Sequence, residues 1–214
     1  MRIVVFGATG YVGSLLATEA VSRGIEVVGV ARSFEERRAP VGVMERAGSI
    51  YDRNSLDELA EWADALVVAL PGRPIDGRSL SDEVPALLAA AEKHGTRLGV
   101  VGGAGGLHTR PGGPRIVDSP DFPAAIKPES LGAADVYDAL SASDTDADWF
   151  YVAPSRTFGA HAPGERTGRF RIGGDEVLLD ENGESRISGP DFAIAFVDEL
   201  ERPQHHRRRF TVGY

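Results

Sequence analysis

The chain has 214 residues, of which 42% are hydrophobic, so it is long enough to bury one substantial core. It contains no cysteine, which excludes disulfides, thiolate catalysis and cysteine-ligated metals. The formal net charge of −9 argues against a surface that binds nucleic acid directly or an acidic membrane. No signal-like segment opens the sequence and nothing approaches a membrane span, so we predict a cytoplasmic protein.

The first thirteen residues predict a strand, a glycine loop and the start of a helix. Arg2–Phe6 is a near-continuous apolar run, typical of a strand buried on both faces, and helical spacing follows over Tyr11–Gly24. Between them, Gly7 permits a tight turn, Gly10 lets a pyrophosphate approach the backbone, and Gly13 allows close helix packing. This arrangement predicts a dinucleotide-binding loop; the alternative is a glycine-rich turn that binds nothing.

Strands and helices are predicted to alternate after this loop. The expected strands are Glu26–Ala31, Ser49–Tyr51, Ala65–Leu70, Leu98–Val101 and Trp149–Val152. The expected helices are Ser55–Trp62, opened by a capping box, Pro85–His94, closed by Gly95, and Pro128–Leu140. A loop of about 25 residues, 102–126, is rich in glycine and proline and is long enough to suggest a functional role. The alternation predicts a Rossmann doubly wound parallel sheet with its ligand at the carboxyl ends of the strands.

A small α+β cap is predicted within the C-terminal part of a single NAD(P)-binding domain that spans residues 1–214. The cap covers residues 154–189, with antiparallel strands expected at Arg169–Ile172 and Glu176–Asp180 and a hairpin turn at Asn182–Gly183. A helix over Pro190–Leu200 and a closing strand at Phe210–Val212 complete the chain. We expect the cap to lie on the substrate side of the sheet.

The end of the second predicted strand indicates which dinucleotide binds. An acidic residue there would accept hydrogen bonds from the ribose of NAD, whereas an arginine would neutralise the 2′-phosphate of NADP. The chain has Arg32 at this point, followed by Ser33. NADP is therefore favoured over NAD. The alternative is that Arg32 forms a surface ion pair with Glu35 or Glu36.

Four segments together resemble the atypical short-chain dehydrogenase/reductase proteins of the NmrA-like, NAD(P)H-binding group. These segments are Gly7–Gly13, Ala31–Ser33, Val100–Gly106 and Pro163–Gly168. The resemblance covers almost the whole chain and implies a Rossmann fold, bound NADP(H), and a substrate pocket beside the C-terminal appendage. It assigns the pyrophosphate to Gly7, Thr9, Gly10, Tyr11, Val12 and Gly13, the 2′-phosphate to Arg32, the adenosine and ribose side to Leu70, Pro71 and Gly72, and the nicotinamide to Gly102 and Gly103.

The sequence departs from the better-known short-chain dehydrogenases at the catalytic groups. Those enzymes use a serine, a tyrosine, and a lysine four residues after the tyrosine; the tyrosine protonates the alkoxide that hydride transfer creates. Counting back from Lys127, the tyrosine position holds Pro123, and glycines stand where the serine is expected. Lys127 remains a candidate for binding the ribose. The proton donor is then another group, water, or absent.

Several side chains are candidates for the missing chemistry. His108, in the long loop, has a side-chain type suited to proton transfer, although a solvated loop histidine is the plainer interpretation. Tyr151 is expected to be a core aromatic residue with a satisfied hydroxyl. Arg156 and His161 follow the last parallel strand and could bind an anion, or simply be solvated. The run His205–Arg209 lacks metal-ligand spacing, so no metal site is predicted.

The leading hypothesis is an NADPH-dependent oxidoreductase that reduces a small carbonyl, quinone or flavin-like acceptor and chiefly positions the nicotinamide. The alternative from another class is a non-catalytic NADP(H)-sensing regulatory protein of the NmrA type, which the missing tyrosine favours. An NAD-retaining epimerase or dehydratase fits less well, because Arg32 replaces the acidic residue. The expected partner is a small-molecule substrate. A homodimer and a regulatory protein partner are both compatible with the sequence.

Overall fold

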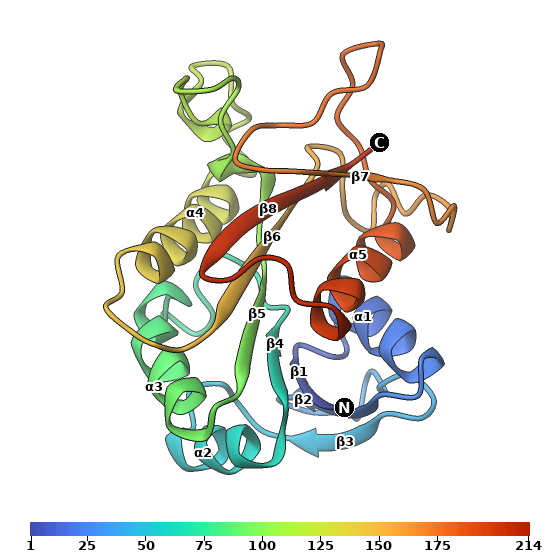
Figure 1. Cartoon of the computed structure of the whole chain (residues 1–214), viewed down its shortest axis with the longest axis vertical. Coiled ribbons are helices and arrows are strands. Elements are labelled where there is room, and N and C mark those ends of the chain that lie inside the picture. The colour runs from blue at the N-terminus through green and yellow to red at the C-terminus, as the bar shows by residue number, and fades with distance from the viewer.

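The computed structural model describes residues 1–214 and contains one eight-stranded sheet flanked by five α-helices (Figure 1). The strands are β1 Arg2–Phe6, β2 Glu26–Ala31, β3 Met44–Ala47, β4 Ala65–Val68, β5 Arg97–Val101, β6 Trp149–Pro154, β7 Arg171–Gly173 and β8 Arg208–Gly213. The helices are α1 Tyr11–Ser22, α2 Arg53–Trp62, α3 Val84–His94, α4 Lys127–Ser141 and α5 Gly189–Glu201. Short 3₁₀ turns occupy Ser81–Glu83, Ala104–Gly106 and Ile116–Asp118.

The strand order is β3-β2-β1-β4-β5-β6-β8-β7, and every pairing is parallel except that of β7 with β8. The chain builds outward from β1 to β3 and then crosses to β4 on the other side of β1. This reversal creates a crevice at the carboxyl ends of β1 and β4, where open α/β sheets bind their ligands. The predicted Rossmann doubly wound sheet is confirmed.

Helices cover both faces of the sheet, as Figure 1 shows. Helices α1 and α5 pack together on one face, while α2, α3 and α4 lie on the other. The two helical layers bury separate apolar clusters against the sheet. Strands β4 and β6 are buried along their whole length, which explains why these segments read as continuous apolar runs rather than as alternating patterns.

The predicted third strand at Ser49–Tyr51 is wrong, because the edge strand is Met44–Ala47 and residues 49–51 form a turn. This edge strand is half-exposed, so it lacks the apolar run by which buried strands are recognised. The predicted capping box at Ser55 is also wrong. Asp52 caps α2 instead, with its carboxylate accepting hydrogen bonds from the amides of Asn54 and Ser55. The helix therefore begins two residues earlier.

The C-terminal segment differs from the expected hairpin. Strand β7 pairs antiparallel with β8, while residues 176–180 form no strand within the cap. Those residues instead join the long loop, since the amide of His108 donates to the carbonyl of Asp175 and the amide of Val177 donates to that of His108. The turn at Asn182–Gly183 does form, closed by a bond from the amide of Asp180 to the carbonyl of Glu184. The division into a main domain and a cap over 154–189 stays a prediction.

Candidate functional site

The glycine loop between β1 and α1 has the geometry that its sequence predicts. Gly7 has φ of +87°, a left-handed conformation that favours glycine, and its amide donates to the carbonyl of Val30 at 2.9 Å. A Cβ on Gly13 would overlap the carbonyl oxygen of Gly7, so only glycine lets α1 start this close to β1. These two glycines shape the loop from behind and do not line the cavity in front of it.

Helix α1 begins with unpartnered backbone amides. Gly10 is its N-cap and offers no side chain to accept a hydrogen bond. The N–H groups of Thr9, Tyr11, Val12 and Gly13 donate to no protein acceptor. Free amides at a helix N-terminus carry a partial positive charge and bind phosphate groups, so this end of α1 fits the pyrophosphate of a dinucleotide.

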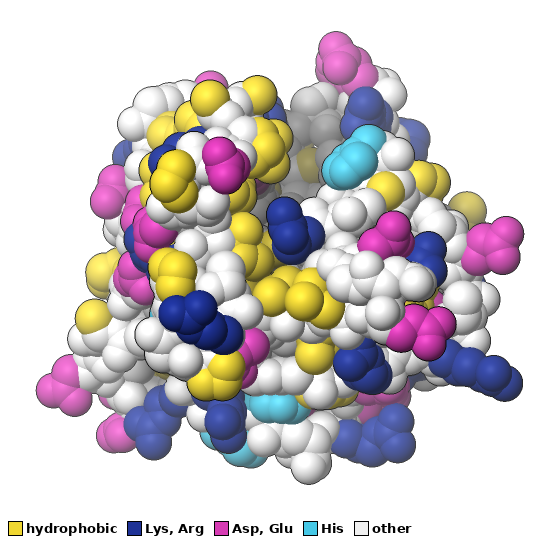
Figure 2. Space-filling model, turned by 90° about the horizontal axis from the view of Figure 1, so that it is seen from above, with side chains coloured by type: hydrophobic (Ala, Val, Ile, Leu, Met, Phe, Trp, Pro, Cys, Tyr) yellow, Lys and Arg dark blue, Asp and Glu magenta, His cyan; other side chains and the backbone are white.

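A cavity of about 1440 Å³ opens in front of these amides. Figure 2 shows the face of the molecule that is seen from above, where the surface is hollowed between hydrophobic side chains and a basic side chain lies beside the hollow. Typical small-molecule sites measure about 300–1,000 Å³, so this cavity has room for a dinucleotide and a second molecule. Its walls come from α1, from the loops after β4, β5 and β6, from α4, and from residues 177–186.

Eight of the predicted cofactor-binding residues line the cavity: Gly10, Tyr11, Val12, Leu70, Pro71, Gly72, Gly102 and Gly103. Six others do not: Gly7, Thr9, Gly13, Arg32, Ser33 and Lys127. Arg32 lies at the end of β2 with 72% of its side chain exposed, and it pairs with Asp76 at 3.1 Å rather than with the nearby glutamates that the alternative interpretation named. Lys127 is the first residue of α4.

Glu129 fixes the loop after β4, a role that sequence reasoning missed. Its carboxylate accepts hydrogen bonds from the amide of Gly72 at 2.7 Å and from that of Arg73 at 3.2 Å. A Cβ on Gly132 would overlap the carbonyl oxygen of Gly72, so the loop and α4 touch backbone to backbone. Gly72 and Gly132 were the sequence signal that could have indicated this contact, since small residues on facing segments let two backbones come close together.

Tyr151 lines the floor of the cavity from β6. Its ring lies where any side chain on Gly102 would have to go, so this glycine is required by packing. The hydroxyl donates to the carbonyl of Ala133 at 2.8 Å and accepts from the amide of Gly103 at 3.1 Å. Burial raises the pKa of Tyr151 to about 12. The residue thus fits the expected core aromatic with a satisfied hydroxyl, and its proton is held by the protein.

The candidate acid His108 lies outside the cavity wall, although its neighbour Thr109 is part of that wall. Its Nδ1 atom is 2.6 Å from the carbonyl oxygen of Gly113, so the ring is used inside the long loop. The face of α4 that lines the cavity carries no tyrosine or lysine; its residues are Glu129, Ser130, Ala133 and Val136. The hydroxyl of Ser130 makes no hydrogen bond within the protein.

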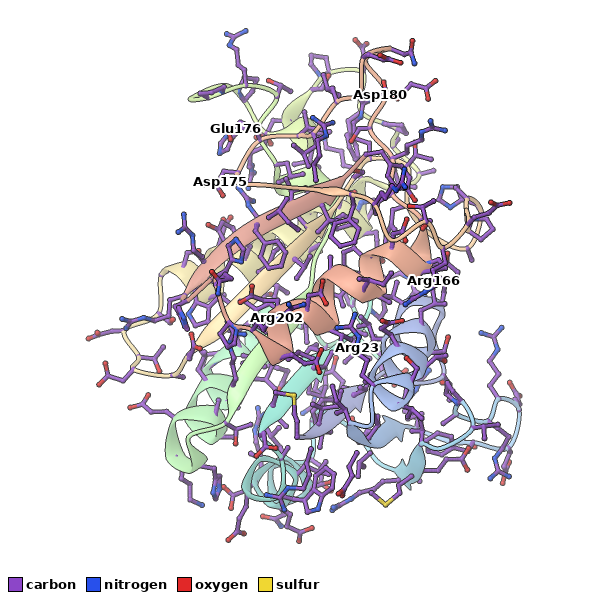
Figure 3. All side chains as sticks on the ribbon, turned by 45° about the vertical axis from the view of Figure 1, so that its right-hand side comes forward. Arg23, Arg166, Asp175, Glu176, Asp180 and Arg202 are labelled. Atoms are coloured by element: carbon purple, nitrogen blue, oxygen red, sulfur yellow. The ribbon has the colours of Figure 1, made fainter.

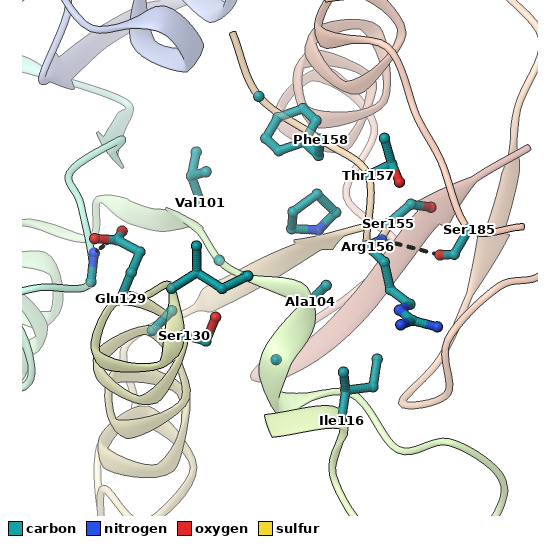
Figure 4. A pocket seen from close by; sticks show the side chains of 18 of the residues that line it. Val101, Ala104, Ile116, Glu129, Ser130, Ser155, Arg156, Thr157, Phe158 and Ser185 are labelled. Carbon is teal, nitrogen blue, oxygen red and sulfur yellow. Dashed lines mark hydrogen bonds between the residues drawn. The ribbon is translucent and has the colours of Figure 1, made fainter. Parts of the chain in front are cut away.

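Residues after β6 form the opposite wall (Figure 4). Arg156 is exposed there, and its amide donates to the hydroxyl of Ser185 at 3.1 Å. Phe158 packs edge-on against Tyr11 with ring centroids 6.4 Å apart. The hydroxyl of Tyr11 is 3.5 Å from the carbonyl oxygen of Pro163. Tyr11 therefore joins the start of α1 to Phe158 on the cavity wall and to Pro163 a few residues further along the chain.

The segment Pro163–Gly168, here called the strap, is held against helices α1 and α5 by an ion pair and by hydrogen bonds. Arg166 contacts the buried carboxylate of Glu19 at 2.5 Å, and Figure 3 shows it on the same side of the molecule as Arg23, which binds that same carboxylate. Asp191, fully buried in α5, accepts hydrogen bonds from Thr167 and Gly168 and from the hydroxyl of Tyr214. These contacts fix the segment that follows the cavity-lining residues Phe158, Gly159 and His161.

The fold and the cavity define an α/β protein with a dinucleotide site of the Rossmann type. Comparison with known families agrees: residues 7–203 match the NAD(P)H-binding family, to which this chain belongs. No cluster of three or more histidine, aspartate or glutamate side chains is arranged to hold a metal. No helix has the length and apolar character needed to cross a membrane.

Relatives share the whole length of the chain. The uncharacterized protein YwnB of Bacillus subtilis is 34% identical over 99% of this chain and 98% of its own. A crystal structure from Bacteroides thetaiotaomicron, titled a "putative epimerase", is 35% identical over 100% of this chain and 96% of its own, with a TM-score of 0.87. A structure from Streptococcus pneumoniae, titled a "putative NADH-flavin reductase", is 30% identical over 100% of this chain and 99% of its own, with a TM-score of 0.81.

Proposed function

We propose that the protein is an NADPH-dependent oxidoreductase that reduces a small carbonyl, quinone or flavin-like acceptor. The observation that carries this proposal is one cavity that begins at the unpartnered amides of α1 and extends beyond the space a dinucleotide needs. The resemblance to a structure titled a "putative NADH-flavin reductase" supports the same class of reaction. Within this proposal, the amides of Tyr11 and Val12 bind the pyrophosphate, and Gly102 and Gly103 border the nicotinamide.

NADPH is the preferred cofactor in this proposal. Arg32 lies at the end of β2, and its side chain is exposed and free to reach a 2′-phosphate once it leaves Asp76. The chain has no acidic residue of its own at the end of β2, where Ser33 follows Arg32 directly, and the carboxylate of Asp76, which comes from the loop after β4, is paired with the Arg32 guanidinium. The backbone sites for the remainder of the dinucleotide do not distinguish NADPH from NADH.

Bound NADPH would supply a hydride, and with it two electrons, to the acceptor and would become NADP⁺. One proton from water would complete the reduction, so no tyrosine would be needed. Ser130 lines the cavity with a free hydroxyl, which we expect to donate a hydrogen bond to the acceptor oxygen or nitrogen that gains charge. The remaining contribution of the protein is to hold the acceptor against the nicotinamide.

Steady-state NADPH oxidation with a panel of quinones, flavins and aldehydes tests the proposal. We expect acceptor-dependent oxidation by the wild type, and about tenfold or greater loss in Gly10→Val, whose side chain would stand over the phosphate-binding amides. Arg208→Gln is the control, since this exposed arginine lies outside the cavity at the opposite end of the sheet. No oxidation above background with any acceptor would contradict the proposal.

A non-catalytic NADP(H) sensor of the NmrA type is the second candidate. The residues on the cavity-facing side of α4 favour this candidate. Glu129 is the one titratable side chain there, and its carboxylate already accepts hydrogen bonds from two backbone amides. A sensor would show no turnover and would recover a protein partner in a pull-down with only one of NADP⁺ and NADPH. The NmrA-like branch, a homodimer and the cytoplasmic location remain predictions.

A further inference from the structure

Arg156 is an arginine without a carboxylate partner on the wall of a cavity. The protein contains many ion pairs, including those of Arg23, Arg97 and Arg166, but none involves Arg156. Its side chain makes no hydrogen bond to the protein, while its backbone amide is fixed by the hydroxyl of Ser185. Figure 4 shows the side chain extending from the segment after β6 along the cavity wall. A positioned backbone with an unused guanidinium is suited to binding an anion.

The position of Arg156 separates it from the phosphates of the cofactor. Strand β6 is three strands away from β1 in the sheet, and strands are spaced about 4.8 Å apart, so Arg156 follows a strand end about 14 Å from the glycine loop. The pyrophosphate is expected at the N-terminus of α1, which follows β1 directly. Arg156 therefore faces the part of the cavity that the second molecule would occupy.

The local charge on this wall is positive. Arg186 also lines the cavity without an ion pair, and its guanidinium lies 6.0 Å from the ring centroid of Tyr214. His161 lies on the same wall, and Glu184 is the one carboxylate there. The other acidic side chains of the cavity, Asp121 and Glu129, belong to the opposite wall.

Apolar side chains line the same cavity as the arginine. Phe158 comes from the same segment, Ile116 and Phe122 come from the long loop, and Val177 and Leu179 come from the segment after β7. Leu179 is 44% exposed, so it is available to cover a ligand rather than committed to the core. A partly apolar cavity whose wall carries guanidinium groups without carboxylate partners suits a molecule that has an apolar body and an acidic substituent.

We propose that the acceptor carries a carboxylate or phosphate group, and that Arg156 binds this group while the reacting end lies over the nicotinamide. The inference rests on the proposed reductase function. It names the substrate class as acidic molecules with an aromatic or otherwise apolar body. Arg156 is then a specificity-determining residue that contacts the substrate away from the atoms that react.

Matched acceptors that differ in one charged group test the proposal. Riboflavin and its monophosphate form one pair, and benzaldehyde and para-carboxybenzaldehyde form the other, so phosphate and carboxylate are tested separately. We expect wild-type kcat/KM to be higher for the charged member of at least one pair. Arg156→Gln should lower that kcat/KM about tenfold or more, chiefly through KM, and change the neutral member less than about twofold.

Two further variants keep the result interpretable. Arg156→Lys should restore part of the lost affinity because it retains the charge, and Arg208→Gln should behave like the wild type because it removes an exposed arginine elsewhere. Equal losses for charged and neutral acceptors in Arg156→Gln would overturn the proposal, as would no loss for either charged acceptor.

A binding measurement separates this inference from the reductase function. The charged acceptors are titrated calorimetrically into protein saturated with NADP⁺, which occupies the phosphate-binding amides and prevents turnover. If no acceptor is ever reduced but Arg156→Gln still abolishes charged-ligand binding, the anion site stands and the reductase proposal fails. If acceptors are reduced and Arg156→Gln binds the charged members as the wild type does, the anion site alone is wrong.

Discussion

The guanidinium of Arg32 lies 3.1 Å from the carboxylate of Asp76, at the end of β2 where the choice between NADP and NAD is expected to be made. Asp76 belongs to the loop after β4 and has a left-handed φ of +51°, so the loop places it against an arginine that comes from another strand. Both side chains are highly exposed, at 72% and 75%, which makes the pair easy to separate. In the proposed NADPH complex, Asp76 would compete with the 2′-phosphate for the same guanidinium.

Replacing Asp76 and replacing Arg32 should change NADPH affinity in opposite directions. Asp76→Asn should tighten NADPH binding by about two- to fivefold, because exposed ion pairs are weak and one competitor is removed. Arg32→Ala should weaken NADPH binding about tenfold or more and leave NADH within about twofold. Fluorescence titrations with both nucleotides measure these constants. Unchanged NADPH binding in Arg32→Ala would place the 2′-phosphate elsewhere.

Alanine at two glycines of the first loop should have different consequences. A Cβ on Gly13 overlaps the backbone of Gly7, so Gly13→Ala should destabilise the fold by about 2–4 kcal/mol. A Cβ on Gly10 is 3.2 Å from the same carbonyl oxygen and stands at the cavity, so Gly10→Ala should mainly weaken dinucleotide binding. Urea unfolding without ligand and NADPH titration separate the two effects. Equal loss of stability in both variants would contradict this assignment.

Removing the hydroxyl of Tyr151 should affect stability and not the chemistry. Tyr151→Phe leaves the amide of Gly103 and the carbonyl of Ala133 without partners, at an expected cost of about 1–3 kcal/mol in unfolding free energy. We expect kcat to stay within about twofold of the wild type and its pH profile to keep its shape. A large loss of kcat with an altered pH profile would instead make Tyr151 the proton donor.

Asp191 should make the attachment of the Pro163–Gly168 strap to α5 sensitive to acid. Burial raises its pKa, but hydrogen bonds from Thr167, Gly168 and Tyr214 outweigh burial, so the pKa of the carboxyl lies below its usual value. A carboxyl with a lowered folded-state pKa stabilises the fold above its unfolded pKa of about 4, and this contribution is lost as pH falls through the folded-state pKa.

Asp191→Asn should therefore lower the unfolding free energy by about 2–4 kcal/mol near neutral pH, and this difference should shrink below about pH 4. Chemical unfolding at a series of pH values measures it. Asp146→Asn is the matched control, since Asp146 is exposed and makes no hydrogen bond or ion pair. A difference that is constant with pH would mean that the ionised carboxylate is not what stabilises the strap.

The fold was largely predictable because its central strands are buried on both faces. The runs at Ile3–Phe6 of β1, at β4 and at β6 are apolar, and Gly95 ends α3 in the left-handed conformation that its position indicates. The edge strand β3 was misplaced, because a half-exposed strand such as Met44–Ala47 follows no strong pattern. The cap strands were mispaired, because β7 takes its partner from β8, far along the chain.

The site was predictable where it is made of backbone and less so where it depends on side chains. Gly10 and Gly102 each mark a place where another group comes close to the backbone. Glycine is suited to such a place whichever group approaches, so the positions of these two glycines in the sequence indicate the loops that form the site. Glu129 binds amides 57 and 56 residues away, and no local pattern signals such a contact. Asp76 likewise reaches Arg32 from a different strand end, which is why the alternative interpretation of Arg32 named only its sequence neighbours Glu35 and Glu36 as ion-pair partners.

The most direct test of the reductase account is single-turnover hydride transfer from NADPH deuterated at the transferable position. The protein is premixed with this NADPH and combined with an acceptor in a stopped-flow instrument, and the product is analysed by mass spectrometry. We predict enzyme-dependent NADPH oxidation, one deuterium in the product of a carbonyl acceptor, and rates at least about tenfold lower in Gly10→Val than in Arg208→Gln. NADPH that binds tightly but is never oxidised faster than without protein would contradict the account and favour the sensor.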